Sequence, residues 1–170
     1  EKYEIVNPHP SFLIKSISEQ GYRLETSLAD LIDNSIYAAA DAIEVLVSTT
    51  EEPFTLFLAD NGNGMTEEVL KESMRFPSAS PDHSRDVTDL GRFGLGMKTA
   101  SFAQTRHFTV LSRPKGSTNY SGRTWDVDNL ESGEWKLKVN GSREVGTLLN
   151  EYSIASKKYL SSHENFEPNT

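Results

Sequence analysis

The sequence predicts an α+β fold, a two-layer sandwich with helices on one face of a mixed β-sheet. Two observations lead to this prediction: helical and strand patterns alternate in the first part of the chain, and strand patterns dominate after residue 107. Elements in this order pack as a layer of helices on a sheet around one hydrophobic core. The 170 residues suit one domain. We expect that domain to span residues 1–156, followed over 157–170 by a polar C-terminal tail or the start of a connection to further domains.

Four helices are predicted. Residues 9–20 form a short one that stops at Gly21, and residues 22–39 form a longer one. Thr66 caps a third, because a threonine hydroxyl accepts a hydrogen bond from the first turn of a helix, and a fourth spans residues 95–102. The longer helix carries an apolar stripe that we expect to pack on the sheet, formed by Leu24, Leu28, Leu31 and Ile32.

Short runs of alternating or apolar residues predict six strands. They lie at residues 43–48, 54–58, 107–112, 120–127, 135–139 and 147–152. A segment rich in proline, serine and charged residues separates the first two strands from the others, over residues 75–91. Connections of this length in a compact domain are usually functional lids or disordered segments, so we interpret this one as a lid.

The composition argues against several classes of function. There are 17 basic and 25 acidic residues, which give a net charge of −8. Because nucleic-acid binding depends largely on neutralising phosphates, we expect no direct nucleic-acid binding by this chain. No apolar run approaches the roughly 18 residues that span a bilayer, and the lack of cysteine excludes disulfides and thiolate zinc sites. We expect no membrane association and a cytoplasmic location.

Asp30 and Asn34 are four residues apart on the longer predicted helix, so they share one face, opposite the apolar stripe. An amide oxygen is a suitable ligand for Mg²⁺, which takes few protein ligands and keeps several waters. A carboxylate beside it can orient or deprotonate an attacking water. Taken alone, the pair is also typical of a solvated helix face.

A polar turn, Asp60-Asn61-Gly62-Asn63-Gly64-Met65, follows the second predicted strand. It has two interpretations. Asparagine and glycine tolerate positive φ, so the segment is typical of a tight turn. Alternatively, Asp60 accepts a hydrogen bond from an exocyclic amine, Gly62 and Gly64 let the backbone approach a flat ring, and Met65 packs under that ring.

The run Gly91-Arg92-Phe93-Gly94-Leu95-Gly96-Met97-Lys98 follows the lid and opens a helix. Glycines at a helix start expose backbone N–H groups, which form an anion site together with the helix dipole. Arg92 and Lys98 add positive charge there. The chain has no G-x-x-x-x-G-K-[ST] motif, which excludes a P-loop. Finally, Gly146 and Thr147 open the last predicted strand, where a hydroxyl can reach a base or an ordered water.

In this order the motifs resemble those of the GHKL superfamily, which comprises gyrase-type topoisomerases, the heat-shock ATPase chaperone, sensor histidine kinases and MutL. The resemblance covers about residues 10–152. Residues 28–45, LADLIDNSIYAAADAIEV, look closest to the bacterial MORC-like and MutL-like branch. The resemblance implies the Bergerat ATP-binding fold, with Mg-ATP as its ligand.

The resemblance also implies a role for each matching residue. Asn34 coordinates Mg²⁺, Asp60 reads the adenine amine with support from Thr147, and Asp30 occupies the position of the carboxylate that activates the attacking water. The other expected ATP-binding residues lie at the base or around the phosphates: Gly62, Gly64, Met65, Gly91, Arg92, Phe93, Gly94, Leu95, Gly96 and Lys98.

Two residues depart from the family pattern. Most ATP-hydrolysing members have glutamate where this chain has Asp30, and the shorter side chain withdraws the carboxylate by about one C–C bond. Tyr37 stands where the family often has aspartate. The expected function is an ATPase module in which Mg-ATP closes the lid and drives association of two copies, as part of a larger DNA-handling or chaperone protein. A non-hydrolysing ATP-binding switch and a histidine-kinase catalytic domain are the alternatives.

Overall fold

The structure is a computed structural model that describes residues 2–4, 6, 8–49, 52–76, 96–159 and 166–170. The described helices are α1 (Pro10–Ser18), α2 (Leu24–Tyr37), α3 (Glu67–Met74), α4 (Gly96–Phe102) and α5 (Ser142–Tyr159), with a 3-10 helix at Val127–Leu130. The described strands are β1 (Ile43–Ser48), β2 (Thr55–Asp60), β3 (His107–Ser112), β4 (Ser121–Asp126) and β5 (Lys138–Asn140). None of these helices is long and apolar enough to cross a membrane.

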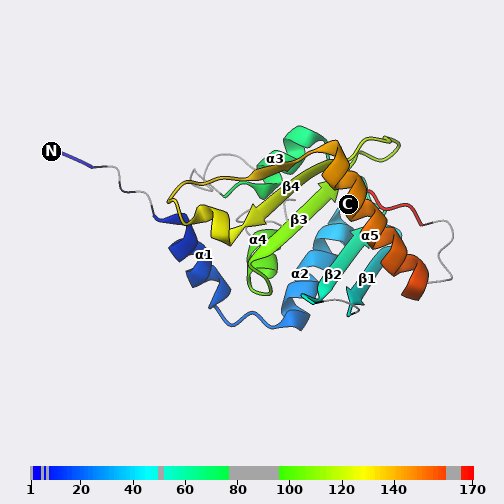
Figure 1. The fold of residues 1–170 in the computed structure, drawn as a ribbon, viewed down its shortest axis with the longest axis horizontal. Helices are drawn as coiled ribbons and strands as arrows, with labels where there is room; N and C mark the ends of the chain where they lie inside the picture. Colours follow the sequence, from blue (N-terminus) through cyan, green and yellow to red (C-terminus); the bar gives the residue numbers. More distant parts are fainter. Residues whose placement is uncertain (1, 5, 7, 50–51, 77–95, 160–165) are drawn as a thin grey trace.

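The strands form two antiparallel sheets, β1–β2 and β3–β4–β5 (Figure 1). The predicted α+β class is confirmed, but the described strand pairs are antiparallel and do not form one mixed sheet. The C-terminal segment lies between the two sheets. The Asp60 amide at the end of β2 donates to the carbonyl of Thr170 at 2.8 Å, and the Arg113 amide after β3 donates to the carbonyl of Asn169 at 2.8 Å.

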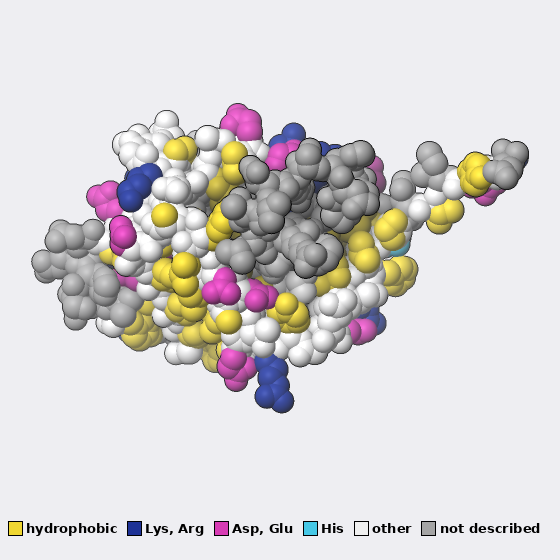
Figure 2. Space-filling model, turned by 180° about the vertical axis from the view of Figure 1, so that it is seen from behind, with side chains coloured by type: hydrophobic (Ala, Val, Ile, Leu, Met, Phe, Trp, Pro, Cys, Tyr) yellow, Lys and Arg dark blue, Asp and Glu magenta, His cyan; other side chains and the backbone are white. Residues whose placement is uncertain are grey.

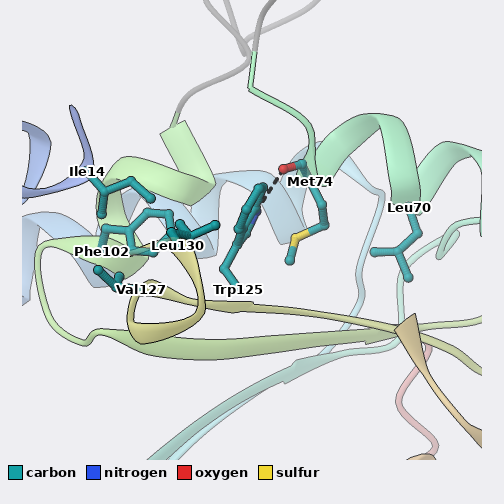
Figure 3. Close-up of a cluster of buried hydrophobic side chains, with 7 residues drawn as sticks. All are labelled: Ile14, Leu70, Met74, Phe102, Trp125, Val127 and Leu130. Atoms are coloured by element: carbon teal, nitrogen blue, oxygen red, sulfur yellow. Dashed lines mark hydrogen bonds between the residues drawn. The ribbon is translucent and has the colours of Figure 1, made fainter. Parts of the chain in front are cut away.

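The main core lies between the three-stranded sheet and helices α1, α3 and α4 (Figure 3). Trp125 of β4 is at its centre, where its indole N–H donates to the carbonyl of Met74 at 2.9 Å. That bond satisfies the polar atom of a nearly buried ring. The other members of the cluster are Ile14, Leu70, Phe102, Val127 and Leu130.

The apolar stripe predicted on α2 is buried only in part, since Leu28, Leu31 and Ile32 are partly buried. Leu24, expected in the packed stripe, is 47% exposed, whereas the buried residues of α2 are Ser27 and Ser35. Both serines make hydrogen bonds to other elements: Ser27 Oγ accepts from Gln104 at 3.0 Å, and Ser35 Oγ donates to Asp60 at 2.9 Å. Two small polar side chains thus add hydrogen bonds to the packing of this helix, which a stripe of apolar residues does not predict.

The strand predicted at residues 147–152 is wrong, because these residues lie within α5. A short apolar run cannot be assigned to helix or strand by its pattern alone. The helical spacing places Tyr152 and Ser156 on one face, where both hydroxyls donate to the buried carboxylate of Glu44 on β1. The strand predicted at residues 135–139 overlaps β5 (Lys138–Asn140) only at residues 138 and 139.

The β1–β2 hairpin lies between two helices. Glu44 on β1 contacts α5. Asp60 on β2 contacts α2 and pairs with Ile43, the residue before Glu44 on β1. Successive residues of a strand point to opposite faces, so α5 and α2 cover opposite faces of the hairpin (Figure 1). This arrangement places the end of β2 directly against α2.

Candidate functional site

Asp60 is the buried centre of the candidate site. It is the last residue of β2 and is only 4% exposed. Its Oδ1 accepts from the amide of Gly62, and its Oδ2 accepts from the hydroxyl of Ser35, each at 2.9 Å. Burial raises the pKa of the Asp60 carboxyl, and the two donors oppose part of that effect. Because each carboxylate oxygen accepts two hydrogen bonds, the group retains capacity for a further donor, such as an adenine amine.

Glycine is required at two positions of the turn that follows Asp60. A Cβ on Gly62 would lie 2.6 Å from the carbonyl oxygen of Ala38, at the end of α2. Gly64 has φ of +63°, and a Cβ there would lie 1.8 Å from the carbonyl oxygen of Arg113. Both glycines therefore allow the turn to pack against neighbouring backbone. Their predicted proximity to a base is compatible with this packing and stays a prediction.

The rest of the turn is also fixed by backbone contacts. Asn61 Oδ1 accepts from the amides of Asp41 and Ala42, both at 2.9 Å. The amide of Met65 donates to Ser112 Oγ at 2.8 Å, while its side chain is partly buried against the main core. Met65 is thus held at the edge of the core, and hydrogen bonds to neighbouring segments give the turn a defined conformation.

Thr147, expected to support Asp60, is exposed on α5, where its hydroxyl donates to the carbonyl of Arg143 at 3.1 Å. The hydroxyl that reaches the Asp60 carboxylate is that of Ser35. Ser35 follows Asn34 directly, but its hydroxyl gave no signal in the sequence because serine is common on solvated helix faces.

Asn169 and Thr170 were assigned to the polar tail and are the other site residues that the sequence did not identify. Asn169 Nδ2 donates to the carbonyl of Gly62 at 2.9 Å. The hydroxyls of Thr170 and Ser112 are 2.7 Å apart. The segment has no alternating pattern, and its contacts are made mainly by backbone atoms, so its place beside the turn could not be deduced from residue types.

Asp30 and Asn34 lie on α2, as predicted. Asn34 is exposed, and the Asp30 side chain is partly buried and accepts a hydrogen bond from the Tyr22 hydroxyl at 2.9 Å. Figure 2, the view from behind, shows acidic side chains beside hydrophobic ones on the side of the molecule where α2 lies. Ser35, the residue after Asn34, contacts Asp60, so the same helix carries both the predicted metal ligand and a donor to the buried carboxylate.

The glycine run is only partly described. Gly91, Arg92, Phe93, Gly94 and Leu95 lie outside the described residues, as does most of the predicted lid. Gly96 begins α4, and a Cβ on it would meet nothing within 4 Å.

Lys98 does not lie at an exposed helix start. It is 2% exposed, and its ammonium donates to the carbonyl of Ser73 at 2.6 Å. It also lies 5.8 Å from the centre of the Phe76 ring. These contacts tie α4 to the end of α3, and a phosphate contact of Lys98 stays a prediction.

The segment that carries α2, the Asp60 turn and α4 also matches a known protein family. The model of the family described as "Histidine kinase-, DNA gyrase B-, and HSP90-like ATPase" matches residues 22–156, which include most of the chain. The chain belongs to this ATPase family. The match confirms the predicted GHKL superfamily.

Similar proteins include three bacterial proteins named Chaperone protein HtpG. The chain is 28% identical to the one from Shewanella frigidimarina over 129 residues, 29% identical to the one from Shewanella denitrificans over 129 residues, and 26% identical to the one from Nitrosomonas eutropha over 145 residues. The matches cover 70%, 70% and 79% of this chain, and 20%, 20% and 22% of the relatives. The chain thus spans about a fifth of their length. The predicted MORC-like and MutL-like branch is not confirmed by these relatives.

Proposed function

We propose that this chain is a nucleotide-binding module that binds Mg-ATP and hydrolyses it. The observation that carries the proposal is the buried Asp60 carboxylate, held at the end of β2 against the helix that bears Asp30 and Asn34. A buried carboxylate with remaining acceptor capacity is costly unless it serves a partner. Membership of an ATPase family supports adenine as that partner.

Asp60 accepts a hydrogen bond from the exocyclic amine of adenine in this proposal. Gly62 and Gly64 let the turn pack closely against Ala38 and Arg113. In this proposal the Asp60 carboxylate is the polar group that contacts the base. Met65, partly buried at the edge of the core, packs against the ring. The specificity for adenine follows because the Asp60 carboxylate accepts a hydrogen bond from an amine and cannot pair with a carbonyl at the same position of another base.

Asn34 is the metal ligand of the proposed site, since its exposed amide presents an oxygen of the kind that Mg²⁺ takes. Bound Mg²⁺ would neutralise charge on the phosphates. The run from Gly91 to Gly96, with Arg92, Phe93 and Leu95, supplies backbone N–H groups and positive charge around the phosphates. Lys98 contributes there only if its contact with Ser73 is exchanged for one with phosphate.

Asp30 is the proposed general base. Water attacks the γ-phosphorus, the bond from that phosphorus to the bridging oxygen breaks, and ADP and phosphate form as a water proton passes to the Asp30 carboxylate. Because Asp30 is shorter than the glutamate usual in the family, we expect turnover below the roughly 1–10³ s⁻¹ of typical enzymes. A binding switch without turnover is the alternative that the short side chain favours. A histidine-kinase catalytic domain would instead transfer the phosphoryl group to a partner protein.

We further infer the setting of the module. Closure of a lid over residues 75–91 would gate association of two copies within a larger cytoplasmic protein. The sequence around Asn34 supports a MORC-like and MutL-like, DNA-handling context, whereas the relatives named as chaperones support a chaperone context. Neither requires nucleic-acid contact by this acidic chain.

Calorimetry and phosphate release on matched variants test the proposal. Wild type should bind Mg-ATP, and Asp60→Asn should lose tenfold or more in affinity, because an amide donor facing the adenine amine costs about 1–3 kcal/mol. Asp30→Asn should keep the affinity and abolish phosphate release. Asp33→Asn, an exposed carboxylate on the same helix, is the control and should change neither.

Three results separate the alternatives. Equal affinities of wild type and Asp60→Asn would remove Asp60 from the site. Binding without phosphate release by wild type, within its full-length protein as well, would favour the switch. Labelling of a partner protein from γ-labelled ATP would favour the kinase.

A further inference from the structure

Tyr22, just before α2, makes a specific contact with the proposed base. Its hydroxyl donates to Asp30 Oδ2 at 2.9 Å, and Asp30 lies 8 positions further along the chain. Among the described residues, no donor contacts Asp30 Oδ1 in the same way. One carboxylate oxygen is therefore held by a phenol, and the other is left to face a different direction.

Tyr22 is itself held through its main-chain carbonyl by Gln104. The Gln104 amide nitrogen donates to the Tyr22 carbonyl at 3.2 Å and to Ser27 Oγ at 3.0 Å. Ser27 is 1% exposed, so this anchor is at the buried face of α2. Gln104 follows α4 by two residues, and α4 begins at Gly96, the last glycine of the phosphate-binding run. Tyr22 thus links the segment after α4 to the Asp30 carboxylate, with its main-chain carbonyl bonded to Gln104 and its hydroxyl bonded to Asp30.

Tyr22 acts in this set as a donor. Hydrogen bonding to Asp30 is the main cause that raises the pKa of the Tyr22 hydroxyl, with burial and the nearby negative charge adding to it. The phenol therefore keeps its proton at neutral pH and above. It holds the carboxylate without competing for the proton that a base must accept.

We propose that Tyr22 is a positioning residue for Asp30: its hydroxyl fixes one carboxylate oxygen so that the other faces the attacking water, and Gln104 fixes Tyr22 relative to α4. A short carboxylate needs such support more than a long one does, because it has less reach to correct a wrong orientation. The inference rests on the proposed hydrolysis and adds the residues that orient its base.

Tyr22→Phe tests the inference, with Tyr37→Phe as the matched control. Tyr37 is on α2, 53% exposed, and has no described role at Asp30. Phosphate release and calorimetric ATP binding would be measured on the full-length protein. Tyr22→Phe should lower kcat about tenfold, because a misplaced catalytic group costs one to two orders of magnitude, and leave the Kd for Mg-ATP within twofold. Tyr37→Phe should change neither.

Two further variants distinguish positioning from general damage. Gln104→Leu should lower kcat by about threefold with the same Kd, as expected for loss of a hydrogen bond one step further away. In Asp30→Glu, where the longer side chain reaches further without help, adding Tyr22→Phe should change kcat by less than twofold. Thermal melting would confirm that each variant is folded.

The outcomes separate this inference from the proposed function. If wild type hydrolyses ATP and Tyr22→Phe does so equally fast, Tyr22 does not position the base, while the ATPase proposal stands. If Tyr22→Phe weakens ATP binding as much as it lowers kcat, its role is structural and the inference is wrong. If wild type binds Mg-ATP but no form releases phosphate, both the hydrolysis proposal and the inference fall.

Discussion

The turn after β2 and the exposed face of α2 carry the two parts of the proposed site, and they are held very differently. Asp60 is buried, and its turn is fixed by hydrogen bonds to α2, to the residues that precede β1, and to the C-terminal segment. Asn34, four residues from Asp30, extends an exposed side chain from a helix surface. The part that would read the base is therefore built into the fold, whereas the metal ligand would be one exposed side chain and the proposed base is held by the hydroxyl of Tyr22.

We therefore expect substitutions in the turn to change both the free energy of unfolding and ligand binding, and substitutions of exposed side chains on α2 to change ligand binding or turnover alone. A buried turn packed against backbone has no room to adjust, so its changes affect folding and binding together. An exposed side chain contributes little to folding, so its changes affect ligand or turnover alone. The predictions below test that separation, beginning with the largest expected effect on stability.

Gly64→Ala should be the most damaging change. The added methyl would lie 1.8 Å from the Arg113 carbonyl oxygen, and φ at Gly64 is +63°. We expect a loss of at least about 3 kcal/mol in the free energy of unfolding and of measurable ATP binding. Gly21→Ala is the control: φ is also positive there, at +76°, but nothing lies within 4 Å, so only the backbone cost of about 1–2 kcal/mol applies. Similar losses in the two variants, measured by chemical unfolding, would contradict a packed turn.

Without nucleotide, the stability of Asp60→Asn relative to wild type should increase as the pH rises. Burial raises the pKa of Asp60 above its ordinary value of 3.8, so the folded state binds the carboxyl proton more tightly than the unfolded state does. Its contribution to stability is complete below pH 3.8 and is lost as pH rises through the folded pKa. The neutral amide avoids this loss. Melting curves between pH 4 and 8 should show a growing advantage for the variant, and a constant difference would contradict it.

Asn34→Ala should change the stability least. The side chain is exposed, so the free energy of unfolding should stay within about 0.5 kcal/mol of wild type. The affinity for ATP in the presence of Mg²⁺ should fall about tenfold, while the affinity in the presence of EDTA should not change, because only the metal contact is removed. An equal loss with and without Mg²⁺ would place Asn34 against the nucleotide itself.

Local elements with clear signals were predictable from the sequence. β1 at residues 43–48 and β3 at 107–112 have the predicted limits, because alternation and flanking polar residues define them. Thr66 caps α3, accepting from the amide of Val69 at 3.3 Å. The ATPase family was also recognised, since its motifs combine short spacings with a fixed order.

What could not be predicted depends on contacts between distant segments. The most buried residues of α2 are Ser27 and Ser35, whose partners are Gln104 and Asp60, and the apolar stripe did not predict these hydrogen bonds. Lys98 was expected at phosphate because it is charged, yet the end of α3 offers it a carbonyl within the core. Thr147 was placed in a strand because a six-residue pattern is too short to exclude a helix.

The contacts of Asn169 also have a consequence for the order in which the molecule assembles. Asn169 reaches the carbonyl of Gly62 across 107 positions of the chain, a separation whose closure is slow compared with the local formation of a hairpin or a helix. The β1–β2 hairpin can form early from neighbouring residues, but its last residue acquires a full set of backbone partners only when residues 169 and 170 arrive. We therefore expect the hydrogen-bonded surroundings of Asp60 to form late in folding, after the elements that carry them.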